Sequence, residues 1–291
     1  MKCKIKEIAE GLSYWKTPVV AEPLSGGLTN KNFKIKYKNK NYMVRIGEDI
    51  PEHGIMRFNE LGASIAGYKV GISPQIVHIE TGALVMDFIV GKTLESKDIR
   101  TNEVLEKILP MLKKCHNDMP QYLTAGLCFW VFQVNRSYGR TLQNSKSDYV
   151  DILPKIMKIN DDLEKAVGKI NLKFGHNDLL AGNFIDSGDK MWLIDWDYAG
   201  YNSPLFDLSG LAANNSLSKN QEKWMLENYF EMALTDELWR QYSAMKCSSM
   251  LRETMWSMVS ESMSNIDFNY KQYTDENITG FEEAYKKFLE L

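Results

Sequence analysis

Apolar and polar residues alternate in the first part of the chain, and this pattern predicts a β-hairpin. Apolar side chains occupy every second position from Phe33 to Tyr37 and again from Tyr42 to Ile46, with a turn at residues 39–41 between the two runs. Successive side chains of a strand point to opposite faces of the sheet, so each run has one buried face. We therefore expect a sheet with one covered face in this region.

The segment that follows is predicted to hold one helix and two more strands. The helix spans residues 55–68 and ends at Gly71-Ile72-Ser73-Pro74, because glycine and proline interrupt helices. Short apolar strands follow at residues 75–79 and 83–88. We place these elements in a small, β-rich N-terminal lobe, residues 1–90.

Helical periodicity dominates after about residue 95 and predicts a larger, mostly helical C-terminal lobe, residues 91–291. Helices are expected at residues 98–117, 129–145, 148–167, 206–214, 219–234, 236–264 and 275–289. Pro110 falls inside the first of these and is expected to kink or split it, because proline removes a helical hydrogen bond. The fold class is thus α+β and bilobal, and the cleft between the lobes is a natural site for a small molecule.

The densest group of chemically active residues lies in the segment FGHNDLLAGNFIDSGDKMWLIDWDYAG, residues 174–200. Asp178 and Asn183 are five residues apart, and Asp195 is expected at the end of a short, apolar, buried strand that begins at Met191. Protein kinases space the Asp and Asn of their catalytic loop in this way, with a metal-binding Asp further on. Such oxygen ligands, together with substrate phosphates, suit Mg²⁺. The alternative is that these residues only form turns, where Asp and Asn are common.

Three features upstream of this segment fit a phosphate-bearing ligand. The paired glycines of SGGLTN, residues 25–30, allow backbone N–H groups to approach an anion, although an ordinary glycine turn is the alternative. Arg45 faces away from its apolar neighbours on the second strand, either as an exposed side chain or as a clamp on phosphates. Glu60 on the following helix either faces solvent or orients Arg45, as the corresponding acid does in kinases.

A different kind of site is predicted near the end of the chain. Leu251, Met255 and Met258 form an apolar helical stripe that belongs to the core. Glu253 and Trp256 are three residues apart and share another face of the same helix. A tryptophan beside a carboxylate could hold a quaternary ammonium group by cation–π attraction, on the order of 0.5–2 kcal/mol per contact. The alternative is that Trp256 is an ordinary core residue.

The composition excludes several classes of protein. Of the 291 residues, 44% are hydrophobic and 25% charged, and the net charge is −3, so a nucleic-acid partner is not expected. No apolar run approaches the ~18 residues of a membrane span, and the charged N-terminus lacks an apolar signal core, so we expect a cytoplasmic protein without membrane insertion. The cysteines lack C-x-x-C spacing and predict neither a zinc site nor disulfides. His116 is expected to bond a local backbone group, and Asp207 to have a structural role.

The motifs HNDLLAGNFI and LIDWDYAGYNSPLFDLS resemble the choline/ethanolamine kinase branch of the aminoglycoside-phosphotransferase-like kinases. SGGLTNKNF resembles the glycine-rich phosphate loop of that family, YMVRIG its third strand, NELGASIAGYKVGISP its acid-bearing helix and VMDFIVGKTL its hinge. TMWSMVSE and FNYKQY resemble the segments that supply the choline-site aromatics. The resemblance thus covers most of the chain and implies a bilobal protein-kinase-like fold.

The resemblance also assigns roles to individual residues. It implies that Asp178 is the catalytic residue and that Asn183 and Asp195 bind Mg²⁺. The nucleotide-binding residues it implies are Gly26, Gly27, Thr29, Asn30, Arg45, Glu60, Asp87, Phe88 and Ile89. The acceptor-binding residues it implies are Asp178, Asp197, Glu253, Trp256 and Tyr273. Glu253 replaces a tryptophan of some choline kinases, and Asp197 is shorter than the usual Glu, so the amine pocket is expected to differ in shape.

The function implied is transfer of the γ-phosphoryl group of ATP, with Mg²⁺, to the hydroxyl of a small amino alcohol, with choline as the first expectation. A kinase of the same fold acting on ethanolamine, thiamine, a sugar or an aminoglycoside is the main alternative, and it would not need Trp256. A non-catalytic nucleotide-binding protein is a further alternative, although it would have little need of Asp178, Asn183 and Asp195 together. The expected partners are ATP and the small acceptor, and homodimer formation is left open.

Overall fold

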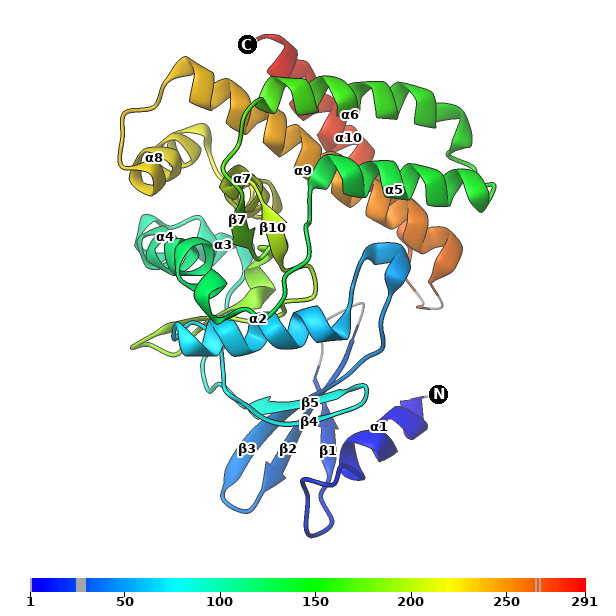
Figure 1. Cartoon of the computed structure of the whole chain (residues 1–291), viewed down its shortest axis with the longest axis vertical. Helices are drawn as coiled ribbons and strands as arrows, with labels where there is room; N and C mark the ends of the chain where they lie inside the picture. Colours follow the sequence, from blue (N-terminus) through cyan, green and yellow to red (C-terminus); the bar gives the residue numbers. More distant parts are fainter. Residues whose placement is uncertain (1, 25–29, 265, 267) are drawn as a thin grey trace.

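The computed structural model describes residues 2–24, 30–264, 266 and 268–291, which form two lobes (Figure 1). The small lobe, at the bottom of the view, holds a twisted sheet, and the large lobe above it is a group of packed helices. This is the bilobal α+β architecture expected from the sequence. The chain crosses from the sheet of the small lobe to a strand of the large lobe between Asp87 and Lys92, and the lobe boundary after residue 90 stays a prediction.

The small lobe is built on a five-stranded antiparallel sheet with the order β1-β2-β3-β5-β4. The strands are β1 (Ala21–Pro23), β2 (Lys31–Tyr37), β3 (Lys40–Ile46), β4 (Ile76–Glu80) and β5 (Ala83–Asp87). The predicted hairpin is β2–β3, with Phe33 opposite Val44 and Ile35 opposite Tyr42 in the register. These alternating side chains are buried, and the loop after α1 (Lys2–Glu10) covers them with Trp15.

Helix α2 (Arg57–Lys69) packs beside the sheet and faces the large lobe (Figure 1). Its first turn carries Glu60, which is buried at the boundary between the lobes. The turn after α2 touches the large lobe directly, because the Ser73 hydroxyl donates to the backbone carbonyl of Leu193 at 2.7 Å. The Leu193 N–H in turn donates to the carbonyl of Ile72 at 2.8 Å. This pair of hydrogen bonds joins the lobes away from the covalent connection.

The large lobe surrounds helix α9, which contacts α5, α6, α7 and α10. Its helices are α3 (Ser96–Ile99), α4 (Asn102–Asn117), α5 (Val131–Asn144), α6 (Leu153–Val167), α7 (Pro204–Asn215), α8 (Lys219–Phe230), α9 (Asp236–Met263) and α10 (Tyr270–Leu289). Two small antiparallel units lie between these helices and the small lobe. They are the pair β7 (Lys173–Gly175) with β10 (Gly200–Asn202), and the sheet of β6 (Lys92–Thr93), β8 (Phe184–Asp186) and β9 (Met191–Leu193).

Three local expectations differ from the structure. Pro110 lies inside α4 without splitting it, because the apolar side of this helix, including Leu109 and Leu112, is buried on both sides of the proline. The predicted helix from residue 98 is instead two helices, since Thr101 caps a new one by accepting from the Val104 N–H. Strand β9 ends at Leu193 rather than at Asp195.

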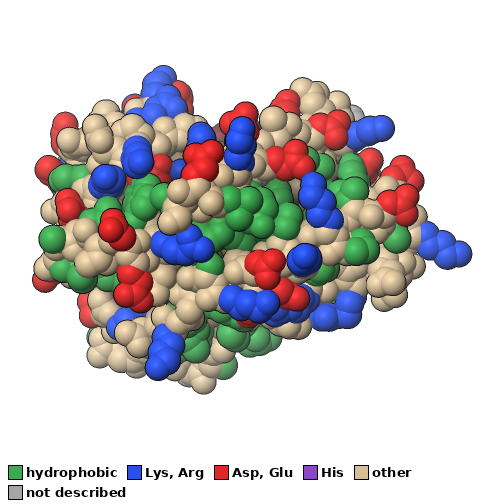
Figure 2. Space-filling view, turned by 90° about the horizontal axis from the view of Figure 1, so that it is seen from above, with side chains coloured by type: hydrophobic (Ala, Val, Ile, Leu, Met, Phe, Trp, Pro, Cys, Tyr) green, Lys and Arg blue, Asp and Glu red, His purple; other side chains and the backbone are tan. Residues whose placement is uncertain are grey.

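Charged side chains of both signs are mixed over the end of the large lobe shown in Figure 2. Acidic and basic groups alternate around a central apolar area, and neither sign forms a continuous stripe on this face. Of the helices in the described part of the chain, none is long and apolar enough to cross a membrane.

Candidate active site

The loop after β7 carries His176, Asn177 and Asp178, and its shape is fixed by side-chain hydrogen bonds. Asn177 has a left-handed backbone (φ 63°), which asparagine tolerates better than most residues. Its amide donates to the carbonyls of Tyr198 at 3.0 Å and Gly200 at 3.1 Å, which ties the loop to β10. His176 is buried, and its ring bonds the carbonyl of Ile194 at 2.9 Å. The loop therefore presents Asp178 on a rigid support.

Asp207, in the first turn of α7, braces this loop from below. Its carboxylate accepts the backbone N–H groups of His176 at 2.8 Å and Asn177 at 2.7 Å. Burial would raise the pKa of Asp207, but the hydrogen bond from His116 and the backbone donors hold it below its usual value. The expectation for His116 was wrong, because its ring bonds Asp207 at 2.9 Å and the Tyr229 hydroxyl at 2.6 Å instead of a local backbone group.

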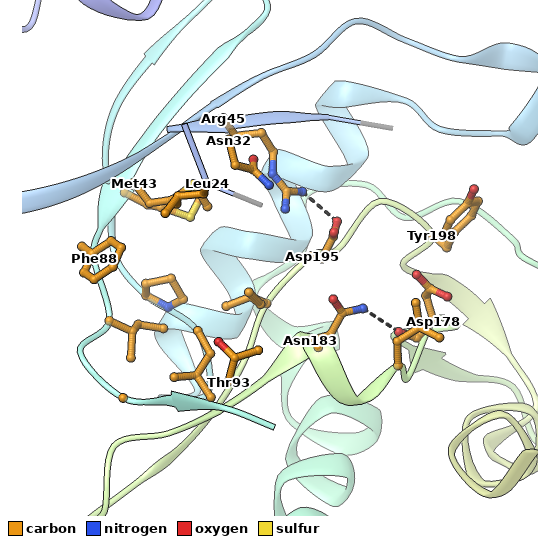
Figure 3. A pocket seen from close by; sticks show the side chains of 18 of the residues that line it. Leu24, Asn32, Met43, Arg45, Phe88, Thr93, Asp178, Asn183, Asp195 and Tyr198 are labelled. Atoms are coloured by element: carbon orange, nitrogen blue, oxygen red, sulfur yellow. Dashed lines mark hydrogen bonds and ion pairs between the residues drawn. The ribbon is translucent and has the colours of Figure 1, made fainter. Parts of the chain in front are cut away.

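Asn183 and Asp195 lie side by side at the open end of the β8–β9 hairpin. The Ile194 N–H donates to the carbonyl of Asn183 at 3.0 Å, which joins the two segments. Asp195 has φ 70°, an unusual backbone for a residue other than glycine, and such strain clusters at functional sites. The Nδ2 of Asn183 donates a hydrogen bond to the backbone carbonyl of Asp178 at 2.8 Å. The side-chain oxygen of Asn183 is therefore left for another partner. Figure 3 shows both side chains in the same space beside Asp178.

The donor set of this corner fits Mg²⁺. It offers one carboxylate, Asp195, whose side chain is 20% exposed, and one amide oxygen, Asn183. Mg²⁺ commonly takes one or two such protein oxygens and completes its shell with substrate phosphates and water. Within the described ranges, no group of three or more His, Cys, Asp or Glu side chains forms a metal cage. These few protein ligands are sufficient for an ion that the phosphates of a nucleotide also coordinate.

Arg45 lies at the centre of a buried ionic cluster between the lobes. Its Nη1 contacts Glu60 at 2.7 Å, Asp195 at 2.8 Å and Asp197 at 3.3 Å, so the expected Arg45–Glu60 contact is present. Arg45 is only 4% exposed, and the three carboxylates keep its pKa above the usual value despite burial. Its Nε has no partner among the described residues, and the side chain lines the main cavity. A free N–H on a fixed guanidinium suits a phosphate oxygen.

Asp197 does not lie where the resemblance implied. Its carboxylate contacts Arg57 at 2.8 Å and accepts from the Asn30 amide at 2.8 Å, in addition to the contact with Arg45. Trp256 and Tyr273 line the main cavity, whereas Asp197 is buried on the side of the small lobe. The structure therefore places Asp197 apart from the other residues expected to bind the acceptor, and an acceptor-binding role for it stays a prediction. Tertiary packing determines the partners of a buried side chain, and the spacing of residues along the chain does not reveal this packing.

The main cavity, about 720 Å³, runs along the boundary between the lobes. Figure 3 shows Met43 and Phe88 at one end and Asp178 and Tyr198 at the other, with Arg45 between them. Asp87, Phe88 and Ile89 line the first end, and contact of this hinge with an adenine stays a prediction. The Phe88 N–H already donates to the Asn41 carbonyl at 3.3 Å, so it is not free for this purpose. Gly26, Gly27 and Thr29 lie outside the described residues.

Asp178 stands at the second end of the cavity in an apolar and acidic environment. Burial raises the pKa of its carboxyl to about 8. The nearby guanidinium of Arg252 opposes this rise, whereas the carboxylates of Glu253, Asp195 and Asp197 add to it. A carboxyl with a raised pKa in a cleft is a candidate proton acceptor.

Glu253, Trp256 and Tyr273 line the same end of the cavity, from α9 and α10. The structure thus brings them together with Asp178, as expected. Both oxygens of Glu253 are engaged, because Oε2 accepts from Arg252 at 2.9 Å and Oε1 accepts from the Tyr273 hydroxyl at 2.8 Å. Trp256 is 7% exposed, and its Nε1 donates to the Tyr198 hydroxyl at 2.8 Å.

Two arginines of the site were not predicted. Arg57 contacts Glu60 as well as Asp197, and its position three residues before Glu60 in one helix was the available signal. Arg252 is 4% exposed and lines the cavity beside Asp178. The signal for Arg252 was a charge at helical spacing from Met255, Trp256 and Val259, which are all buried. A lone charge on a buried helix face is rare unless it has a partner or a function.

The fold and the cavity define a class of protein, a phosphotransferase of kinase-like architecture that acts on an alcohol. The family model "Choline/ethanolamine kinase" matches residues 21–224. The chain belongs to the choline/ethanolamine kinase family.

Known proteins resemble the chain at moderate identity. It is 29% identical over 286 residues to a probable ethanolamine kinase of Arabidopsis thaliana, a match that covers 87% of this chain and 76% of that protein. It is 25% identical over 209 residues to protein LicA of Haemophilus influenzae, covering 70% of this chain and 61% of LicA. A crystal structure of LicA in complex with AMP superposes with a TM-score of 0.73 at 23% identity, covering 97% of this chain and 98% of that one. The last similarity concerns the fold alone.

Proposed function

We propose that this protein transfers the γ-phosphoryl group of ATP to the hydroxyl of a small amino alcohol, with choline as the first candidate. The observation that supports this most is the single cavity that joins the hinge at Phe88 to Asp178. It passes Arg45, Asn183 and Asp195, the groups that suit phosphates and a divalent ion. The family match and the AMP complex of LicA agree with a nucleotide in this cavity.

The nucleotide would lie with its base between Met43 and the hinge and its phosphates toward Asp195. Asn183 and Asp195 would hold Mg²⁺, which when bound neutralises charge on the phosphates. Arg45, which Glu60 holds at 2.7 Å, would meet a phosphate oxygen through its free Nε. Phosphoryl transfer needs chiefly positioning and charge neutralisation, and these residues supply both.

Asp178 would position the acceptor hydroxyl and take its proton. As the bond between the acceptor oxygen and the γ-phosphorus forms, the bond to the β–γ bridging oxygen breaks, and ADP leaves with that electron pair. The hydroxyl proton passes to the carboxylate of Asp178. The loop under Asp178 is rigid because Asp207 and Asn177 hold its backbone, so the carboxylate keeps its orientation.

Ethanolamine is a second candidate acceptor, favoured by one observation. The face of the Tyr198 ring, which could stack against a quaternary ammonium group, already carries the guanidinium of Arg252 at 4.2 Å. A primary ammonium depends on hydrogen-bond acceptors more than on aromatic faces. Carboxylates at Asp178 and Glu253 line the same end of the cavity.

The proposal is tested by ADP release from Mg-ATP with a panel of choline, ethanolamine, thiamine, several sugars and kanamycin. The wild-type protein is compared with Trp256→Ala, and Asp178→Asn serves as the inactive reference. We expect turnover with an amino alcohol, and a fall of ~10²-fold or more for Asp178→Asn, the usual scale for a positioned base.

The choice of acceptor decides between the candidates. Choline turnover that collapses in Trp256→Ala would support choline and the aromatic contact. Turnover with ethanolamine alone would support the second candidate. Turnover only with a sugar or kanamycin, or full activity of Asp178→Asn, would contradict the proposal.

A further inference from the structure

The buried side chain of Arg252 has no role in the proposed binding of nucleotide, Mg²⁺ or acceptor. It extends from α9 into the acceptor end of the cavity and is 4% exposed. Its Nη1 donates to Glu253 at 2.9 Å, whereas Nε and Nη2 have no partner in the described part of the chain. The guanidinium lies 4.2 Å over the ring of Tyr198 and 5.5 Å from that of Phe129. Aromatic faces hold its position but cannot accept these two hydrogen bonds.

The two free N–H groups point to a particular kind of ligand. Nε and Nη2 form one edge of the guanidinium, and this edge matches two oxygens of a single phosphate or carboxylate. Leaving charged donors unsatisfied in a buried site is costly, so a ligand with oxygen acceptors would be strongly favoured there. An ammonium group has only donors and is repelled by the same charge. The amine of the acceptor therefore does not satisfy Arg252.

The surrounding charges favour a phosphoryl group as this ligand. Asp178, next to which the acceptor hydroxyl would lie, lines the same end of the cavity as Arg252. Of the two carboxylates near Arg252, Glu253 already pairs with Nη1, and Asp178 makes no hydrogen bond to the edge formed by Nε and Nη2. The phosphoryl group that reaches the acceptor oxygen beside Asp178 would bring several anionic oxygens to this corner. Among the described residues that line the cavity, Arg252 is the cation at the acceptor end, whereas Arg45 lies further toward the nucleotide end.

We propose that Arg252 binds, through Nε and Nη2, the oxygens of the phosphoryl group as it arrives on the acceptor. This inference rests on the proposed function. Arg252 makes and breaks no covalent bond; it stabilises the negative charge on the transferred group and on the phosphorylated alcohol before release. It thus acts at the acceptor end, as Arg45 acts at the nucleotide end.

The test measures binding of phosphoethanolamine, phosphocholine and inorganic phosphate by calorimetry, together with the free alcohols. The proteins are wild type, Arg252→Gln, Arg252→Lys and the control Arg240→Gln, which alters an exposed arginine of the same helix. We expect Arg252→Gln to lose about tenfold or more in affinity for the phosphorylated alcohol, the scale of a charged hydrogen-bonded pair. Affinity for the free alcohol should stay or rise, and kcat should fall without a matching rise in KM for the alcohol.

The variants separate the outcomes. Arg252→Lys keeps the charge but loses the forked edge, so it should fall between wild type and Arg252→Gln, and Arg240→Gln should match wild type. If Arg252→Gln is folded and binds the phosphorylated alcohol as wild type does, the proposal is overturned. If Arg252→Gln instead loses affinity for a carboxylate-bearing alcohol such as serine, Arg252 binds the carboxylate of the acceptor and not the transferred phosphoryl group. The proposal is then also overturned. Arg252-dependent binding of inorganic phosphate without turnover of any alcohol would support the anion site and contradict the proposed function.

Discussion

At the level of single residues, Asp178 is half-buried although its proposed role needs the charged form. Burial and nearby carboxylates raise its pKa to about 8, from the ordinary value of 3.8. The folded protein therefore binds this proton more tightly than the unfolded chain does. By linkage, the stabilisation from Asp178 is complete below pH ~4 and is lost as the pH rises through ~8.

This gives a prediction for stability in the absence of nucleotide and metal. The Asp178→Asn variant keeps the shape but cannot ionise, so it should unfold at a higher temperature than wild type at pH 9 and at about the same temperature at pH 4. Each kcal/mol corresponds to roughly 2 °C in a protein of this size, so a gap of at least ~2 °C is expected at pH 9. Thermal unfolding followed by circular dichroism measures it.

The exposed Asp151→Asn variant is the control for that comparison and should show no such gap. If the unfolding temperatures of Asp178→Asn and wild type differed by the same amount at both pH values, the prediction would be wrong. The charge of Asp178 would then not destabilise the folded protein.

How well single residues could be predicted depends on whether their partners are local. Asp178, Asn183 and Asp195 were recognisable because one loop and one hairpin set their positions, so spacing along the chain carried the information. The contacts of Asp197 could not be predicted in this way, because its partners Arg57 and Asn30 come from distant segments. The buried position of Arg252 likewise depends on how α9 packs, which its own sequence does not specify.

At the level of elements, the contact between β7 and α7 controls the catalytic loop. A Cβ atom added to Gly175 at the end of β7 would lie 2.9 Å from Oδ2 of Asp207. The same carboxylate oxygen accepts the backbone N–H of His176, so it cannot move away without losing that bond. The glycine is thus needed for the close approach of the two elements rather than for a special backbone angle.

We therefore predict that Gly175→Ala lowers the free energy of unfolding by ~2 kcal/mol, the scale of a lost buried hydrogen bond to a charged group. Its kcat should fall about tenfold or more, because the support of Asp178 shifts. Urea unfolding and steady-state kinetics measure the two effects. Gly182→Ala is the matched control for stability, since an added Cβ there meets nothing within 4 Å. Equal stability of both variants would contradict the prediction.

Most elements were predictable from periodicity, because the β2–β3 hairpin and the long helices each bury one regular face. The errors lie at the ends of elements. Strand β9 stops before Asp195 because that residue adopts a left-handed backbone, and α4 continues past Pro110 because packing outweighs the missing hydrogen bond. Both results depend on tertiary contacts.

At the level of the whole molecule, several contacts join the lobes besides the chain connection. One is the pair of hydrogen bonds between Ile72-Ser73 and Leu193, and another is the ionic cluster around Arg45. Trp196 strengthens the first, since its Nε1 donates to the Ser73 hydroxyl at 2.9 Å. This contact is neutral and fully bonded, so it should act as a fixed point when the lobes move.

Hydrogen exchange with mass spectrometry tests this. Peptides covering residues 70–73 and 189–193 should be protected to the same extent with and without Mg-ATP, because their hydrogen bonds do not depend on ligand. Peptides from β2 and β3, which line the cavity through Asn32 and Met43, should gain protection when the nucleotide binds. A large gain in protection at residues 189–193 would show instead that the fixed point lies elsewhere.

The ionic cluster also has a consequence for inheritance. Two arginines and three acidic residues from both lobes form a network of ion pairs, in which Arg45 and Arg57 both contact Glu60 and Asp197. A substitution at one of these positions removes a partner from a buried opposite charge and unbalances the cluster, which costs several kcal/mol. During evolution, the residues of this cluster can therefore be replaced only by paired substitutions that keep the buried charges balanced. Surface positions are free of that constraint and can drift one at a time.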